Sequence, residues 1–148
     1  MAWRVVVVDD VAQMRWLLTS LLSLDSDFDV VGEGSDGLAA IDVVTEQQPD
    51  VVLLDWWMPG VDGLAALPEI RRLAPRAIVV LMSASPPSEM QSWATEVGAD
   101  GFYNKDPHTA HRVAHDLRNL MTARASPVGR RAPRTIDGTF VRQNGTDS

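Results

Sequence analysis

The stretch VVLLDWW, Val51–Trp57, carries the clearest fold signal in the chain. Four branched apolar residues follow one another without the alternation of polar and apolar positions that marks a half-exposed strand. An unbroken run of this kind is typical of a strand buried on both faces of a parallel sheet. Asp55 would then stand at the carboxyl end of that strand, at the sheet edge where ligands of open α/β folds bind.

The same pattern recurs in both directions along the chain. We expect further strands at Arg4–Val8, Phe28–Val31, Ile78–Met82 and, more weakly, Gly101–Asn104. Helical patterns lie between them, at Met14–Leu22, Leu38–Gln47, Leu64–Leu73, Pro86–Gly98 and from Asp106 and Pro107 onward. Pro68 is expected to kink the third helix or delay its start. Five alternating strand–helix units predict an α/β fold, a doubly wound parallel sheet.

Length and charge limit the class of protein. The 148 residues, 45% of them hydrophobic and none a cysteine, suit one cytoplasmic domain without disulfides. Neither a signal peptide nor an apolar run of membrane-spanning length is visible. Residues 1–123 carry 8 Lys and Arg against 18 Asp and Glu, whereas residues 124–148 carry 5 Arg against 2 Asp. We therefore expect a folded domain at 1–124 that binds neither DNA nor membranes, and a flexible basic tail at 125–148.

The residues that could carry chemistry stand where the expected strands end. In chain order they are Asp9, Asp10, Asp55, Ser83 and Lys105. In a parallel sheet these ends share one edge, so the side chains should meet there. Three carboxylates repel one another unless a cation neutralises them, and Mg²⁺ prefers such oxygen ligands. The hydroxyl and the ammonium could hold phosphoryl oxygens, which predicts phosphoryl transfer with a carboxylate as nucleophile.

Four stretches together resemble the receiver domain of bacterial two-component response regulators, over residues 3 to about 123. They are VVVVDD (5–10), DWWMPGVDG (55–63), Ser83-Ala84 and GADGFYNK (98–105). Two more, VVGEGSDGLAAI (30–41) and NKD (104–106), look most like the LuxR/NarL-type branch, whose receivers usually precede a helix-turn-helix. The resemblance implies a flavodoxin-like, chemotaxis-like fold with five strands in the order 2-1-3-4-5 and helices on both faces.

The resemblance also implies how the acidic residues work. Asp55 would accept a phosphoryl group from the phosphohistidine of a sensor histidine kinase or a phosphotransfer protein. Mg²⁺ would be held directly by Asp10, by Asp55 and by the backbone carbonyl of Trp57. Asp9 would contribute largely through water.

Three further roles follow from the same resemblance. Lys105 would bind one phosphoryl oxygen, and Ser83 would move to hydrogen-bond another. Phe102 would be an aromatic switch that swings inward with Ser83. Burial of its ring should be favourable, because phenylalanine has no hydroxyl that needs a hydrogen-bond partner. The surface made by the fourth helix, fifth strand and fifth helix would then change and bind a downstream protein effector or a second copy of the chain.

A glycine motif offers a competing interpretation. GEGSDG, Gly32–Gly37, matches G-x-G-x-x-G between a strand and a helix, and Asp55 follows about twenty residues later, as in a dinucleotide site. The receiver topology instead places the motif beside an edge strand, away from the switch point between the first and third strands. A dinucleotide site would also leave Ser83 and Lys105 without a role. We therefore interpret the motif as a turn.

The leading interpretation is a stand-alone switch that catalyses only its own phosphorylation and dephosphorylation. Only 24 residues follow Arg124, too few for a DNA-binding module. The alternative is the receiver part of a truncated or degenerate transcriptional regulator, and the length of the open reading frame would distinguish the two. A pseudo-receiver with an inert site is a further alternative, although no acidic or hydroxyl residue of the motifs is missing. A haloacid-dehalogenase-type phosphatase needs a second Asp where Trp57 stands.

Two weaker signals remain. His108, His111 and His115 share one face of the last expected helix, opposite its apolar stripe, and we favour a solvated surface over a metal site there. One of Trp56 and Trp57 is expected to pack against the domain while the other is exposed. An indole at Trp57 could obstruct the water that removes the phosphoryl group, which predicts slow dephosphorylation.

Overall fold

The computed structural model describes residues 2–58, 60–83, 96, 98–106, 108, 110–125 and 134–135. Its strands are β1 Trp3–Val8, β2 Phe28–Gly34, β3 Val51–Asp55, β4 Ile78–Ser83, β5 Gly101–Asn104 and β6 Arg134–Thr135. Its helices are α1 Ala12–Ser23, α2 Gly37–Gln47, α3 Gly63–Leu73 and α5 Val113–Ala125, the last preceded by the 3₁₀ turn η1 Ala110–Arg112. Most of the fourth predicted helix, residues 86–95 and 97, lies outside the described part of the chain.

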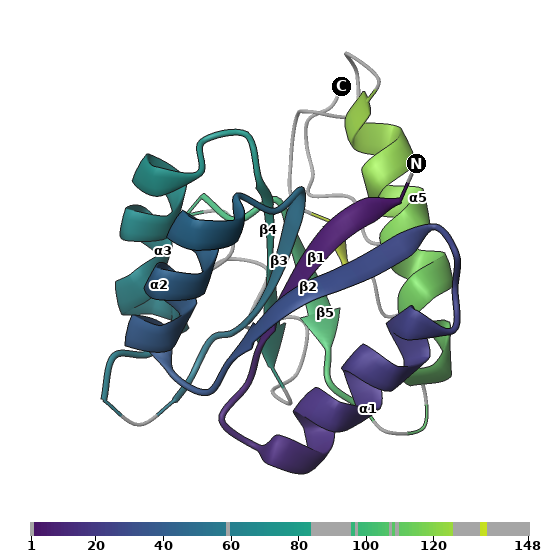
Figure 1. The fold of residues 1–148 in the computed structure, drawn as a ribbon, viewed down its shortest axis with the longest axis horizontal. Coiled ribbons are helices and arrows are strands. Elements are labelled where there is room, and N and C mark those ends of the chain that lie inside the picture. The colour runs from purple at the N-terminus through teal and green to yellow at the C-terminus, as the bar shows by residue number, and fades with distance from the viewer. Residues whose placement is uncertain are drawn as a thin grey trace.

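All strands are parallel, in the order β2-β1-β3-β4-β5-β6, so the predicted order of the first five is confirmed. Helices α2 and α3 cover one face of the sheet, and α1 and α5 cover the other (Figure 1). The two-residue strand β6, which pairs with β5, is not predicted. It falls in the segment for which a flexible tail is expected. The sequence does not predict this strand because two residues without an apolar run carry no strand signal.

The central strands contribute side chains to two cores, which explains their unbroken apolar runs. In β1, Val5 and Val7 face the core under α1 and α5, whereas Val6 and Val8 face the core under α2 and α3. Residues 51–54 of β3 divide between the two cores in the same alternating way. Each of these side chains is fully buried. A strand with a core on both faces has no position left for a polar residue.

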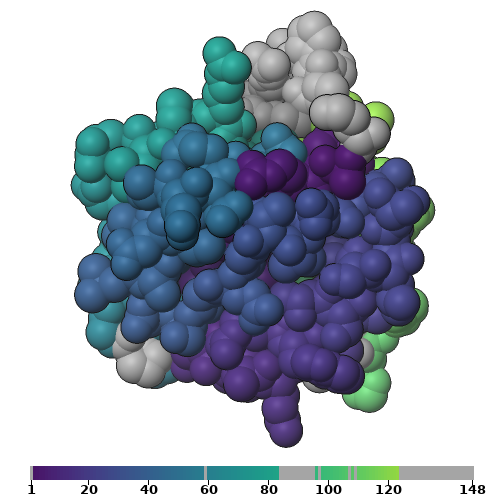
Figure 2. All heavy atoms as spheres, viewed as in Figure 1, coloured from purple at the N-terminus to yellow at the C-terminus, as the bar shows by residue number. Residues whose placement is uncertain are grey.

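The edge strand β2 is longer than predicted and takes in the first half of the glycine motif, so that Gly34 is its last residue. Its pairing with β1 slips by one residue: Val5 lies opposite Val30, but Val6 lies opposite Gly32. A Cβ on Gly32 would collide with the Val43 side chain of α2, so glycine lets the helix pack closely on this strand. In the space-filling view the segments from α1 to α2, purple to blue, form most of the visible face (Figure 2).

Helix α3 starts one residue from its predicted position, whereas the last helix starts later than predicted. Helix α3 begins at Gly63 and contains Pro68, so the proline does not delay its start; the Asp62 carboxylate accepts the Ala65 N–H and caps the first turn. The last helix begins later than predicted. The Asp106 carboxylate accepts the His108 N–H, but regular helix starts only after the 3₁₀ turn at Ala110. An Asp–Pro pair suits an isolated turn as well as a helix start, so the signal is ambiguous.

Candidate functional site

The parallel register brings the predicted site residues to one edge of the sheet. Asp55 is the last residue of β3 and lies opposite Met82 of β4. Ser83 is the last residue of β4 and lies opposite Asn104 of β5, so Lys105 comes one residue beyond that pair. The backbone N–H of Lys105 donates to the Ser83 carbonyl at 2.9 Å, which continues the ladder past the end of β5.

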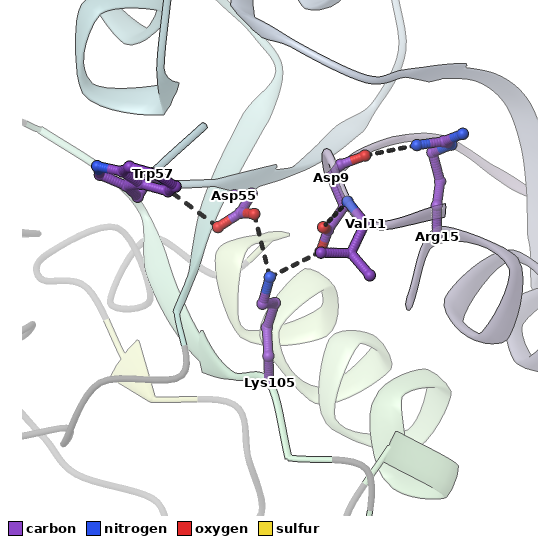
Figure 3. Close-up of polar contacts among 6 residues, drawn as sticks. All are labelled: Asp9, Val11, Arg15, Asp55, Trp57 and Lys105. Carbon is purple, nitrogen blue, oxygen red and sulfur yellow. Dashed lines mark hydrogen bonds and ion pairs between the residues drawn. The ribbon is translucent and has the colours of Figure 1, made fainter. Parts of the chain in front are cut away.

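Lys105 joins the ends of the first and third strands (Figure 3). Its ammonium donates to Asp9 Oδ2 at 2.9 Å and to Asp55 Oδ2 at 3.0 Å. The Asp9 side chain is fully buried, that of Asp55 is 5% exposed and that of Lys105 is 12% exposed. Because water is largely excluded, these are strong charge-assisted contacts rather than surface ion pairs.

Asp9 is held at each of its polar groups. Its Oδ1 accepts the Val11 N–H at 2.9 Å while Oδ2 accepts from Lys105. Its own N–H donates to the Gly34 carbonyl at 3.1 Å, and its carbonyl accepts from Arg15 Nη1 at 2.6 Å. Each carboxylate oxygen of Asp9 has a donor and its backbone is held on both sides, so the side chain is fixed in orientation before any ligand arrives.

Asp10 completes an acidic cluster. Carboxylate oxygens of Asp9, Asp10 and Asp55 lie within 4.8 Å of one another, and Asp10 is half-buried while the other two are buried. One ammonium offsets only part of the charge of three carboxylates. Hard oxygen donors with residual negative charge and access to water suit Mg²⁺, so the residues present fit the predicted ion.

The ionisation of the cluster reflects this imbalance. Burial raises the pKa of Asp55 to about 7 and the Asp9 charge adds to the rise, although the Lys105 ammonium opposes it. Burial lowers the pKa of Lys105, but its hydrogen bonds and ion pairs with the two carboxylates outweigh burial and leave that pKa raised. The lysine therefore stays charged at neutral pH, and a further cation would be needed to keep Asp55 fully ionised.

The two tryptophans after Asp55 behave as expected. Trp56 is partly buried and packs against the core under α2 and α3, and its backbone N–H donates to the Met82 carbonyl at 2.9 Å. Trp57 is 63% exposed, and its backbone N–H lies 3.4 Å from Asp55 Oδ1. Trp57 therefore lies largely in solvent, while its backbone stays beside the carboxylate.

Ser83 and Phe102 are both buried, at 2% and 1% exposure. Phe102 stands on β5 opposite Leu81 of β4. The Phe102 side chain is thus buried within the domain. The residues from 84 to 95, which follow Ser83 in the chain, lie outside the described structure.

The glycine motif has a packing role. The Gly37 N–H donates to the Val61 carbonyl at 2.7 Å, and a Cβ on Gly37 would collide with that same carbonyl. Gly63 likewise leaves room for the Asp55 carbonyl. Both glycines let the N-termini of α2 and α3 pack closely against the loop that carries Trp57. The Gly37 N–H, which a dinucleotide phosphate would need at this helix N-terminus, is already bonded to Val61.

Sequence reasoning missed Gly37, Gly63 and Arg15 as parts of this site. Arg15 lies in the first turn of α1, where a positive charge opposes the helix dipole, and that misfit is the one signal that could have marked it. The predicted histidine surface is confirmed: His108, His111 and His115 are all exposed. Within the described residues, no helix is long and apolar enough to span a membrane.

Comparisons with known proteins agree with this geometry. A family model for the response regulator receiver domain matches residues 5–115. The chain is 37% identical over 121 residues to the chemotaxis protein CheY of Bacillus subtilis, covering 82% of this chain and 99% of that protein. It is 39% identical to a protein-glutamate methylesterase/protein-glutamine glutaminase of Myxococcus xanthus, but spans 39% of that relative's length.

Solved structures show the same likeness. The signal receiver domain of NarL from Mycobacterium tuberculosis has a TM-score of 0.74 and 35% identity, covering 82% of this chain and 97% of that domain. The complex of the CheA3 P1 domain with CheY6 from R. sphaeroides matches with a TM-score of 0.68 and 34% identity, over 81% of this chain and 97% of the matched one. Phosphorylation on Asp and binding of Mg²⁺ are features of the family that these proteins represent. With the family model spanning most of its length, the chain belongs to the response regulator receiver domains of two-component signal transduction.

Proposed function

We propose that this chain is a cytoplasmic, phosphorylation-activated switch, in which Asp55 accepts a phosphoryl group from the phosphohistidine of a sensor histidine kinase or phosphotransfer protein. One observation carries the proposal: the Lys105 ammonium lies 3.0 Å from Asp55 Oδ2 inside a buried acidic cluster. A structural ion pair would need one carboxylate for one lysine. Three carboxylates with one lysine leave negative charge that suits a divalent ion and a phosphoryl group.

In the proposed transfer, an Asp55 oxygen forms a bond to phosphorus while the P–N bond of the phosphohistidine breaks. The imidazole leaves with the bonding electron pair. Lys105 then exchanges its hydrogen bond to Asp55 for one to a phosphoryl oxygen, keeping its bond to Asp9. Because Asp55 must be ionised to attack, the cations around it matter as much as its position.

The proposed metal ligands are Asp10, Asp55 and the Trp57 carbonyl, with Asp9 acting through water. Bound Mg²⁺ would supply positive charge for the oxygens of the transferring group. The described residues support this assignment by their chemistry, since the cluster offers carboxylate oxygens within 4.8 Å of one another. The exposed face of Asp10 leaves room for coordinated water.

The output of the switch is proposed to pass through Ser83 and Phe102. The Ser83 carbonyl accepts the Lys105 N–H, so a movement of Ser83 toward a phosphoryl oxygen would pull on the end of β5. Phe102 is on the same strand and already buried. A changed surface around β5 and α5 would bind a protein effector or a second copy of the chain.

Phosphorylation with a small-molecule phosphodonor tests the proposal directly. With acetyl phosphate and Mg²⁺, intact-mass spectrometry should show one added phosphoryl group, which EDTA prevents. Asp55→Asn should abolish the addition, whereas Asp29→Asn, which removes an exposed carboxylate on β2, should not. Phosphorylation of Asp55→Asn to the wild-type level would refute the proposed acceptor.

The receiver part of a truncated or degenerate DNA-binding transcriptional regulator is the second candidate. The 35% identity to the receiver domain of NarL favours it. Both candidates share the proposed chemistry at Asp55 and differ in what the phosphorylated domain controls. The reading frame of the gene decides between them: a DNA-binding module encoded in the same frame would establish the second.

A further inference from the structure

Arg15 connects the acidic loop to the edge of the sheet. It projects from the first turn of α1, and its Nη1 donates to the backbone carbonyl of Asp9 at 2.6 Å (Figure 3). Its Nε donates to Glu33 Oε1 of β2 at 3.1 Å. The Arg15 side chain is 21% exposed and that of Glu33 is 48% exposed. The guanidinium therefore uses its fork to hold two chain segments at once.

The carbonyl that Arg15 binds belongs to the peptide bond between Asp9 and Asp10. A peptide unit is planar, so fixing its oxygen also fixes the direction of the following N–H and the position of the Asp10 Cα. The pairing of β1 with β3 ends at Val8 and Leu54, one residue earlier. Arg15 thus holds the first peptide that lies beyond the sheet ladder.

Asp10 depends on this restraint more than the other two carboxylates do. The Asp9 carboxylate is held by Val11 and Lys105, and that of Asp55 by Lys105 and by the Trp57 backbone. No hydrogen bond from the described residues reaches the Asp10 carboxylate, which is only half-buried. Its direction is therefore set through its backbone.

We propose that Arg15 is a positioning residue for the divalent cation, acting through the Asp9–Asp10 peptide; this rests on the proposed function of the acidic cluster. The arginine touches neither the ion nor the phosphoryl group. It orders the loop so that Asp10 and Asp55 present their oxygens to the same point. Donors of this kind around metal ligands commonly change metal affinity by about 10- to 100-fold.

The charge of Arg15 supports an alternative account, which predicts the opposite change in Mg²⁺ affinity when the arginine is removed. A guanidinium near a cation site repels the cation, so if charge alone mattered, removing it would tighten Mg²⁺ binding. If positioning dominates, removing it weakens binding. Arg15→Gln and Arg15→Lys separate the two accounts, because lysine keeps the charge but lacks the planar fork.

The test is the dissociation constant of Mg²⁺, measured by calorimetric titration of the unphosphorylated protein. We expect Arg15→Gln to weaken binding about tenfold and Arg15→Lys to lie between it and wild type. Arg72→Gln is the matched charge control, since Arg72 pairs with its neighbour Glu69 on the exposed face of α3, and this variant should bind Mg²⁺ as wild type does. Thermal midpoints in EDTA establish that each variant is folded at the titration temperature.

Two results would overturn the inference. One is an Arg15→Gln affinity equal to or tighter than wild type; the other is an Arg15→Lys affinity equal to wild type. If Arg15→Gln does not fold, the lysine variant alone decides. Failure of the wild-type protein to bind Mg²⁺ at all would instead refute the proposed function, so the two failures are distinguishable.

Discussion

Lys105 and Asp9 lie 96 residues apart in the chain, and their ammonium and carboxylate meet at 2.9 Å where the Asp9 side chain is fully buried. The same ammonium binds Asp55, so one positive charge holds together the ends of β1, β3 and β5. Its removal would leave two buried carboxylates facing each other. The site therefore contributes to the stability of the domain as well as to its proposed chemistry.

Lys105→Met should destabilise the metal-free protein by about 3 kcal/mol at neutral pH, because breaking a buried pair leaves an uncompensated charge. The loss should shrink at lower pH, where Asp55, whose pKa burial already raises to about 7, accepts a proton. Urea unfolding in EDTA at several pH values measures both effects. Arg72→Met, at an exposed pair, should change stability little. Equal stability of Lys105→Met and wild type at neutral pH would contradict the buried-pair account.

Asp55→Asn should stabilise the metal-free fold at and above neutral pH. Burial raises the pKa of Asp55, so the folded state binds a proton more tightly than the unfolded chain does. The favourable contribution of Asp55 to the stability of the folded state is complete below the ordinary carboxyl pKa and is lost as the pH rises through about 7. The stability gain of Asp55→Asn over wild type should therefore grow across that window, to about 1–3 kcal/mol.

The measurement is urea unfolding of both proteins in EDTA across this pH range. Added Mg²⁺ should narrow the gap at neutral pH, since the ion stabilises wild type through the charge that the variant lacks. Asp29→Asn, at an exposed position, should show no such pH-dependent gain. A gain that falls as the pH rises would mean that Asp55 is stabilised, not penalised, by its surroundings.

Much of the fold follows from local sequence, because the apolar runs of β1 and β3 have a core on each face and leave no room for a polar residue. The acidic site follows as well, since strand ends in a parallel sheet must share an edge. Arg15 and Gly37 could not be found in this way. Their roles depend on which carbonyl lies opposite them, and that is a property of the folded chain. The start of α5 and the strand β6 likewise depend on tertiary contacts, where local signals are ambiguous or absent.

Gly37→Ala should destabilise the protein by about 1–3 kcal/mol, the usual cost of overpacking. Helix propensity alone predicts the opposite sign, because alanine is favoured over glycine inside a helix such as α2. The loss is expected because the added Cβ collides with the Val61 carbonyl, which the Gly37 N–H binds. Urea unfolding gives the sign directly, with exposed Ser35→Ala as the neutral control. A stabilised Gly37→Ala would show that the close approach to Val61 is not required.

Trp57→Asn should speed the loss of the phosphoryl group from Asp55. Trp57 is 63% exposed and its backbone N–H lies beside the Asp55 carboxylate, so a ring turned toward the site would obstruct an attacking water. Asparagine is smaller and polar and would admit and orient that water. An increase of about three- to tenfold, roughly 1 kcal/mol of barrier, is expected. After phosphorylation with acetyl phosphate and removal of the donor, decay is followed by intact mass in Mg²⁺. Trp57→Phe keeps most of the bulk and should stay near the wild-type rate, so that equal decay in all three proteins would exclude obstruction by the ring.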